Sequence, residues 1–181
     1  RNAGEASRNG LEAMVQWTPV PRFTARMAYT YQDFEFTRFV APEGDFTGNA
    51  EPGVPPHQLF LGASYDAPFG LFSAVELRSV DAYPVNSTNT IANWAYQVVN
   101  LRFGLNRRWN GVGFRPFVGI DNLFDERYNA STITNNTGNR FFEPAPGREV
   151  YVGITLGAEL FWAARPRASK DFVARSVHQG G

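Results

Sequence analysis

Cysteine is absent from the 181 residues of this chain, and lysine occurs once, as Lys170. The lack of cysteine excludes a disulfide scaffold, a thiolate zinc site and an iron–sulfur cluster. Basic and acidic side chains balance at 17 each, whereas nucleic-acid-binding proteins normally carry a basic excess. No apolar run approaches the ~18 residues that a membrane-spanning helix needs. If this chain meets a membrane, it therefore does so without helices.

Aromatic residues are plentiful and charged residues are few. Aromatic residues make up 15% of the sequence and charged residues 19%. An average soluble domain has about 25% charged residues. Residues 1–4 contain neither an initiator methionine nor the start of a signal peptide, and they resemble sequence from within a longer or processed protein. We therefore expect one domain that is a fragment of a larger protein.

Seven segments alternate apolar and polar residues with a period of two, which predicts β-strands. They are residues 10–17, 23–32, 57–65, 71–82, 99–109, 114–121 and 149–162. Short turns and longer loops alternate between them, and the two longest loops, 37–56 and 125–148, are rich in glycine and proline. Pro116 argues against an interior position for the sixth segment in a globular sheet, because proline cannot donate to a β-ladder.

An antiparallel meander with these connections has short turns at one end and large loops at the other. Barrels of the bacterial outer membrane sort their loops in this way and carry aromatic girdles at both interfaces. The alternation places aromatic residues of the apolar face near the short-turn end, namely Trp17, Phe23, Tyr65, Trp109, Phe114 and Trp162. The pattern therefore predicts an all-β fold, a segment of an up-and-down transmembrane β-barrel with about seven strands.

The opposite face of these strands is polar, and strands in lipid can keep charge only on the inside of a barrel. The predicted lumen-facing residues are Arg26, Arg102, Arg115 and Asp121. We expect the arginines to pair with Glu12, Glu76 or Asp121, although contact with another part of the protein inside the lumen is an alternative. A soluble sandwich or lipocalin-like barrel, with its apolar face turned inward, shows the same alternation and stays open.

Two motifs carry a family resemblance. Residues 119–128 read GIDNLFDERY, and FFEPAPGR follows at 141–148 before the closing strand. This order resembles the C-terminal barrel region of TonB-dependent outer-membrane receptors, and weaker matches extend from residue 2 to residue 162. The motif residues are Asn122, Leu123, Phe124, Asp125, Tyr128, Glu143, Pro144, Pro146, Gly147 and Arg148.

The resemblance implies a 22-stranded barrel whose lumen is filled by a plug that binds TonB. Residues 1–162 would form the C-terminal portion of that barrel, without the plug, and 163–181 a basic, disordered tail. The implied function is a share in active uptake of a ferric siderophore or similar scarce ligand across the bacterial outer membrane. The implied partners are outer-membrane lipid, the remaining barrel and plug, and the TonB complex through the missing plug.

The outer loops offer candidate ligand contacts, because arginine beside aromatic rings suits an anionic iron chelate. These residues are Arg140, Phe141, Phe142, Tyr83, Asn86 and Asn89. We expect the two family motifs to have a structural role. No catalytic set, metal-ligand spacing around His57 or cofactor motif is present in the sequence, so we expect no enzyme. A small complete outer-membrane barrel with an adhesin or structural role, or a soluble lipocalin-like binder, remains the alternative.

Overall fold

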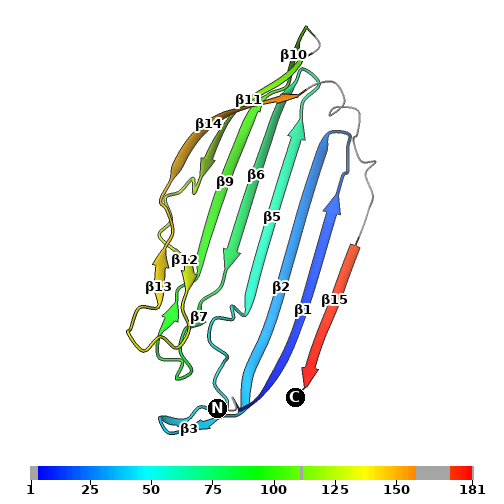
Figure 1. Cartoon of the computed structure of the whole chain (residues 1–181). Helices are drawn as coiled ribbons and strands as arrows, with labels where there is room; N and C mark the ends of the chain where they lie inside the picture. The colour runs from blue at the N-terminus through cyan, green and yellow to red at the C-terminus, as the bar shows by residue number, and fades with distance from the viewer. Residues whose placement is uncertain (1–3, 111, 158–171, 181) are drawn as a thin grey trace.

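A computed structural model describes residues 4–110, 112–157 and 172–180. Nine antiparallel strands form one sheet in the order β10-β11-β9-β6-β5-β2-β1-β15, with β14 paired to the other side of β11 (Figure 1). Their bounds are β1 (Glu5–Trp17), β2 (Phe23–Arg38), β5 (His57–Asp66), β6 (Leu71–Val80), β9 (Tyr96–Leu105), β10 (Arg107–Trp109), β11 (Val112–Asp121), β14 (Glu149–Gly157) and β15 (Phe172–Gly180).

The sheet is a single curved layer with tight turns at one end and long loops at the other (Figure 1). The loops contain three short hairpins, β3 (Val40–Ala41) with β4 (Gly44–Asp45), β7 (Tyr83–Pro84) with β8 (Ala92–Asn93), and β12 (Asn129–Thr132) with β13 (Phe142–Pro144). No helix in the described part of the chain is long and apolar enough to cross a membrane. The all-β, antiparallel fold expected from the alternation is confirmed, and the described sheet does not close into a barrel.

The register gives the sheet two unlike faces. Met27 of β2 lies opposite Leu61 of β5, which lies opposite Leu77 of β6. One residue along, Arg26 lies opposite Gly62 and Gly62 opposite Glu76. We call these the apolar face and the polar face. Because side chains on the apolar face are open to their surroundings, with Met27 and Leu61 each 38% exposed, this face suits contact with lipid.

Pro116 is accommodated inside the sheet, contrary to the sequence-based expectation. Strand β11 pairs with β14 on one side and with β9 and then β10, one after the other, on its other side. The pairs Phe117 with Gly104 and Phe114 with Arg107 keep one register across Pro116, but β9 ends and β10 begins opposite it. Since proline has no N–H to donate, the ladder is interrupted there without a change of register.

The structure also differs from the expected disordered tail. Phe172–Gly180 forms strand β15, which pairs with β1 from Ser7 opposite Gly180 to Val15 opposite Phe172. An edge strand such as β1 offers a row of unpaired backbone groups, and this pairing satisfies them. The basic composition of residues 163–181 alone did not indicate this strand. The sequence-predicted end of the last long strand, including Trp162, lies outside the described residues.

Candidate functional site

The three long loops pack against one another at one end of the sheet, and asparagine side chains join them. The Nδ2 of Asn49, after β2, donates to the Ser87 carbonyl at 2.8 Å, and the Nδ2 of Asn89 donates to the Ala50 carbonyl at 2.9 Å. The Oδ1 of Asn135, after β11, accepts from the backbone N–H of Ser87 at 2.8 Å. The loops that follow β2, β6 and β11 therefore behave as one unit, which we call the loop cluster.

The loop after β2 is also anchored to β1. The guanidinium of Arg8 donates to both carboxylate oxygens of Glu51, at 2.8 and 2.7 Å. Such a bidentate pair fixes geometry better than a single contact. At the tip of this loop, hydrogen bonds from the hydroxyl and backbone of Thr47 hold the pKa of Asp45 below its ordinary value.

The polar loop residues expected to contact ligand form hydrogen bonds within the loop cluster instead. The Oδ1 of Asn86 accepts from the backbone N–H groups of Thr90 and Ile91, both at 3.1 Å. The Tyr83 hydroxyl lies 3.3 Å from the Thr132 hydroxyl. Asn89 bonds to Ala50 as described above. These three side chains therefore hold loops in place in the structure.

The second candidate group, residues 140–142, divides into buried and exposed members. Phe141 is 6% exposed, and its carbonyl accepts from the backbone N–H of Ile133 at 2.9 Å. Phe142 is 40% exposed, and Arg140 is exposed. Trp94, which the sequence reasoning missed, is 85% exposed in the loop after β6. Arg140, Phe142 and Trp94 thus offer a cation and two aromatic surfaces at the loop end.

Replacing Asn135 by alanine should loosen the loop cluster. Loss of its Oδ1 leaves the Ser87 backbone N–H and hydroxyl, bonded at 2.8 and 3.1 Å, without their acceptor. We expect amide exchange in residues 81–95 to accelerate about fivefold, corresponding to ~1 kcal/mol for a partly exposed hydrogen bond. Hydrogen-exchange mass spectrometry measures this. Asn139→Ala is the control, because Asn139 has a similar positive φ, 55° against 52° at Asn135, and therefore carries the same backbone strain without a bond to Ser87. Equal exchange in both variants would contradict the role of Asn135.

The two family motifs bind each other. Asn122 is 3% exposed, and its side chain accepts from the N–H of Glu126 at 2.8 Å and donates to the Glu126 carbonyl at 2.9 Å. Asp125 accepts from the backbone N–H of Arg148 at 2.8 Å. The Arg148 guanidinium reaches the Leu123 carbonyl at 3.4 Å. The first motif therefore follows the end of β11 and is hydrogen-bonded to the residues that lead into β14. Phe124, in the same motif, is 72% exposed.

The long loop after β11 also folds onto the polar face of the sheet. The ring of Tyr128 stacks on Tyr96, with centroids 4.7 Å apart, and both pack with Val80 and Val98. Farther along, the Ala145 N–H donates to the Tyr128 carbonyl at 2.9 Å. The loop end of the polar face is therefore covered by protein.

Arginines near the short-turn end of the polar face lie over aromatic rings. The Arg102 Cζ is 3.9 Å from the centroid of Phe117, and the Arg115 Cζ is 3.6 Å from that of Phe72. Neither these arginines nor Arg26 form an ion pair within the described ranges, so the expected pairing with Glu12, Glu76 or Asp121 is wrong there. The register explains this, because Arg102 faces Ala74 and Gly119 across the strands, not a carboxylate.

Rings on the polar face cover glycines of neighbouring strands. A Cβ at Gly119 would lie 2.1 Å from the Tyr151 ring, and one at Gly153 would lie 2.4 Å from the Phe117 ring. Phe117 and Tyr151 in turn meet edge to face. Asp121 lies nearer the loops, opposite Glu149. A side chain at either position would require the ring to move, because the ring occupies that space.

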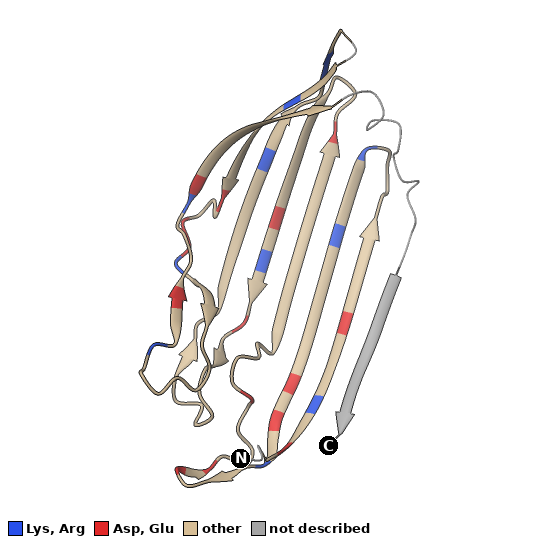
Figure 2. Ribbon diagram, viewed as in Figure 1, with Lys and Arg blue, Asp and Glu red and all other residues tan. Residues whose placement is uncertain are grey.

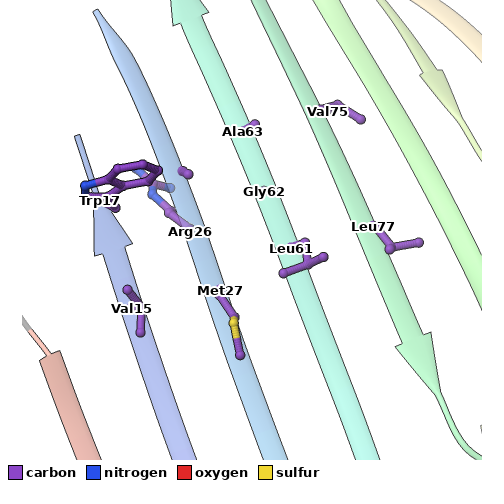
Figure 3. Close-up of a pocket in the computed structure, with 10 residues that line it drawn as sticks. Val15, Trp17, Arg26, Met27, Leu61, Gly62, Ala63, Val75 and Leu77 are labelled. Atoms are coloured by element: carbon purple, nitrogen blue, oxygen red, sulfur yellow. The ribbon is translucent and has the colours of Figure 1, made fainter. Parts of the chain in front are cut away.

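Aromatic residues of the apolar face gather at the short-turn end. Trp17 is 55% exposed, Tyr65 42% and Trp109 74%. Phe23 lies opposite Tyr65, and Phe114 lies on β11. Beside Trp17, the small side chains of β2 and β5 leave a shallow depression of about 360 Å³ (Figure 3). Labelled side chains around it are mostly aliphatic, so it matches a lipid acyl chain better than a polar ligand.

The described residues contain no group of three or more histidine or acidic side chains that would hold a metal ion. The Nδ1 of His57 lies 2.7 Å from the Tyr29 hydroxyl, and its ring stacks on Tyr31 with centroids 5.1 Å apart. His57 is therefore part of an aromatic cluster where β5 begins.

Comparison with known proteins places the chain in a family. The model of the TonB-dependent receptor-like β-barrel matches residues 1–123. The chain is 21% identical to the siderophore receptor PiuA from Acinetobacter baumannii, with a TM-score of 0.70 over 83% of this chain and 22% of that one. For BauA, the ferric preacinetobactin receptor of the same organism, identity is 19% and the TM-score 0.71, over 85% and 22%.

A third solved structure is the ferric citrate transporter FecA, which is 18% identical with a TM-score of 0.70, over 84% of this chain and 24% of that one. The chain thus spans less than a quarter of each of these structures. The family comprises receptors and transporters of the outer membrane, not enzymes. Since the match covers more than half of its residues, this chain belongs to the TonB-dependent receptors and forms part of their outer-membrane β-barrel.

Proposed function

We propose that the chain forms part of the wall and outer loops of a receptor that imports a ferric siderophore or similar iron chelate. The observation that carries this proposal is the fit of the sheet to receptors whose names state iron-chelate ligands, over 83–85% of the chain. In this proposal the remaining barrel strands and the plug come from polypeptide outside this chain, and TonB acts through the plug. Residues 1–162 would then belong to the barrel, and strand β15 (Phe172–Gly180) adds to its sheet beside β1.

Arg140 and Phe142 are the favoured ligand contacts from this chain, with Trp94 as a third. A guanidinium forms charge-assisted, often bidentate hydrogen bonds with carboxylate or catecholate oxygens. Exposed rings such as Phe142 and Trp94 stack on flat ligand groups. The loop cluster holds these residues on a shared frame, which reduces the entropy lost when ligand binds.

Arg140→Ala in the complete receptor should weaken binding of an anionic ferric chelate. Loss of one charge-assisted hydrogen bond costs ~1.5–3 kcal/mol, or about a 10- to 100-fold rise in Kd. Binding of radiolabelled iron complexes, from a panel of catecholate, hydroxamate and carboxylate chelates, to cells without other iron receptors measures it. Arg127→Ala, another exposed arginine of the same loop, is the control. If no chelate binds, or if both variants bind equally, the proposed ligand or the role of Arg140 is wrong.

A cationic ligand is the second candidate. Acidic residues outnumber arginines at the loop end of the described sheet (Figure 2), and such a surface attracts cations over a Debye length of ~10 Å at 0.1 M salt. The panel should therefore include cationic metal complexes. Added salt would slow the association of a cationic ligand with this acidic surface and would speed up the association of an anionic ligand. The direction of the change therefore separates the two candidates.

A further inference from the structure

A two-arginine site lies on the polar face near the short turns, away from the loops considered for ligand. Arg102 extends from β9 and Arg115 from β11, and their guanidinium groups lie over Phe117 and Phe72 at 3.9 and 3.6 Å. Both arginines line one hollow of about 180 Å³. The polar side chains of this face that also line it are Ser64, Asp66 and Thr155.

Neither arginine has a carboxylate within ion-pair distance in the part of the chain that the structure describes, although Asp66 lines the same hollow and acts on Arg115 through its charge. Among those residues, neither one donates a hydrogen bond or forms an ion pair, and Asp66 lies beyond ion-pair distance of both. The Nε of Arg115 is buried and has no acceptor. A buried donor without an acceptor costs free energy, and a guanidinium in this position costs more. Two guanidinium groups therefore share one hollow without an anion bound directly to either of them.

The stacking of each guanidinium on a ring determines which of its N–H groups can still donate hydrogen bonds. A ring against the face of a guanidinium leaves the N–H groups in the plane free to donate. Phe72 is only 5% exposed, and a Cβ at Gly104 would lie 2.7 Å from it, so its ring is tightly held. The two cations are thus fixed on rigid supports, with donors suited to the two oxygens of a carboxylate.

We propose that Arg102 and Arg115 bind an aspartate or glutamate carboxylate of a polypeptide segment packed against the polar face. Two observations favour a polypeptide over a dissolved anion. No described residue outside the sheet is seen to cover the polar face around this hollow, because the described loops pack on its opposite end. The chain also spans less than a quarter of the similar solved structures, so most of such a receptor lies outside it. The inference holds whichever ligand the receptor imports.

Carbodiimide cross-linking of the complete receptor in isolated outer membranes tests this site. Arg102→Lys and Arg115→Lys, made separately, keep the positive charge and introduce an amine. The reagent joins that amine to a neighbouring carboxylate as an amide, and takes up the water that is lost. Because Lys170 is the only natural lysine of the chain, the new product is readily recognised by peptide mass spectrometry. Arg22→Lys, in the exposed turn between β1 and β2, is the control.

The expected product links position 102 or 115 to an acidic residue outside residues 1–181. Its yield should exceed that of the control at least about tenfold, because a bound carboxylate has a high effective concentration. No product, or a product with Asp66 alone, would overturn the proposal. In a second measurement, acetate should leave the melting temperature of the wild-type receptor unchanged. A rise with acetate that is lost in the Arg102→Gln, Arg115→Gln double variant would assign the site to a free anion and also overturn it.

Discussion

Replacement of Gly104 by alanine should prevent normal assembly of the sheet between β9 and β11. An added Cβ would lie 2.2 Å from the Pro116 carbonyl oxygen and 2.7 Å from the Phe72 ring. A backbone oxygen inside a β-sheet cannot rotate away, and Phe72 is held beneath Arg115. Overpacking of this kind costs ~1–3 kcal/mol or more, and we expect the upper end, about 3 kcal/mol. Urea titration and protease resistance of the complete receptor in outer membranes measure the loss.

The control for this prediction is Gly138→Ala in the loop after β11. There the added Cβ would meet only the Asn136 side-chain oxygen, at 3.2 Å. Because that oxygen is the end of a half-buried loop side chain, which can shift by a few tenths of an ångström, the variant should assemble like the wild type. If Gly104→Ala were as stable as Gly138→Ala, then β9 and β11 would not approach each other as closely as described.

The strands could be predicted from the sequence because alternation is a local property. The aliphatic residues of β14, for example, occupy every second position from Val150 to Leu156 whatever lies beside them. The ring-over-glycine packing is different. Gly104 meets Phe72, and Gly153 meets Phe117, only after two strands adopt a particular register. Sequence reasoning recognised the polar face but had no means to pair its glycines with rings.

The loop contacts were harder to predict, because they join residues far apart in the sequence. Asn89 bonds to Ala50 across 39 positions, and Asn135 to Ser87 across 48. A polar loop residue that binds a ligand and one that binds another loop have the same composition. The expected ligand contacts Asn86 and Asn89 therefore proved to hold the loops, whereas exposed Trp94 was missed.

Asn122→Ala should weaken the hydrogen-bonded contact between the two family motifs. The substitution removes both hydrogen bonds to Glu126 and leaves that residue's N–H and carbonyl without these partners. It also places alanine at a φ of 53°, which asparagine tolerates and alanine adopts at a cost of ~1–2 kcal/mol. Together we expect about 3 kcal/mol, or a roughly 100-fold faster amide exchange across residues 122–148. Hydrogen-exchange mass spectrometry of the complete receptor measures it.

Two further variants separate these contributions. Asn122→Gly accepts the positive φ but loses the side-chain bonds, so it should retain most of the destabilisation. Asn139→Ala, at an exposed site with a φ of 55°, carries the backbone strain without a buried side chain and should affect only its own turn. If Asn122→Gly exchanged like the wild type, backbone conformation alone would explain this asparagine. If it exchanges like Asn122→Ala, the side-chain bonds of Asn122 join the end of β11 to the start of β14, which makes the motif a structural element of the barrel and not a ligand contact.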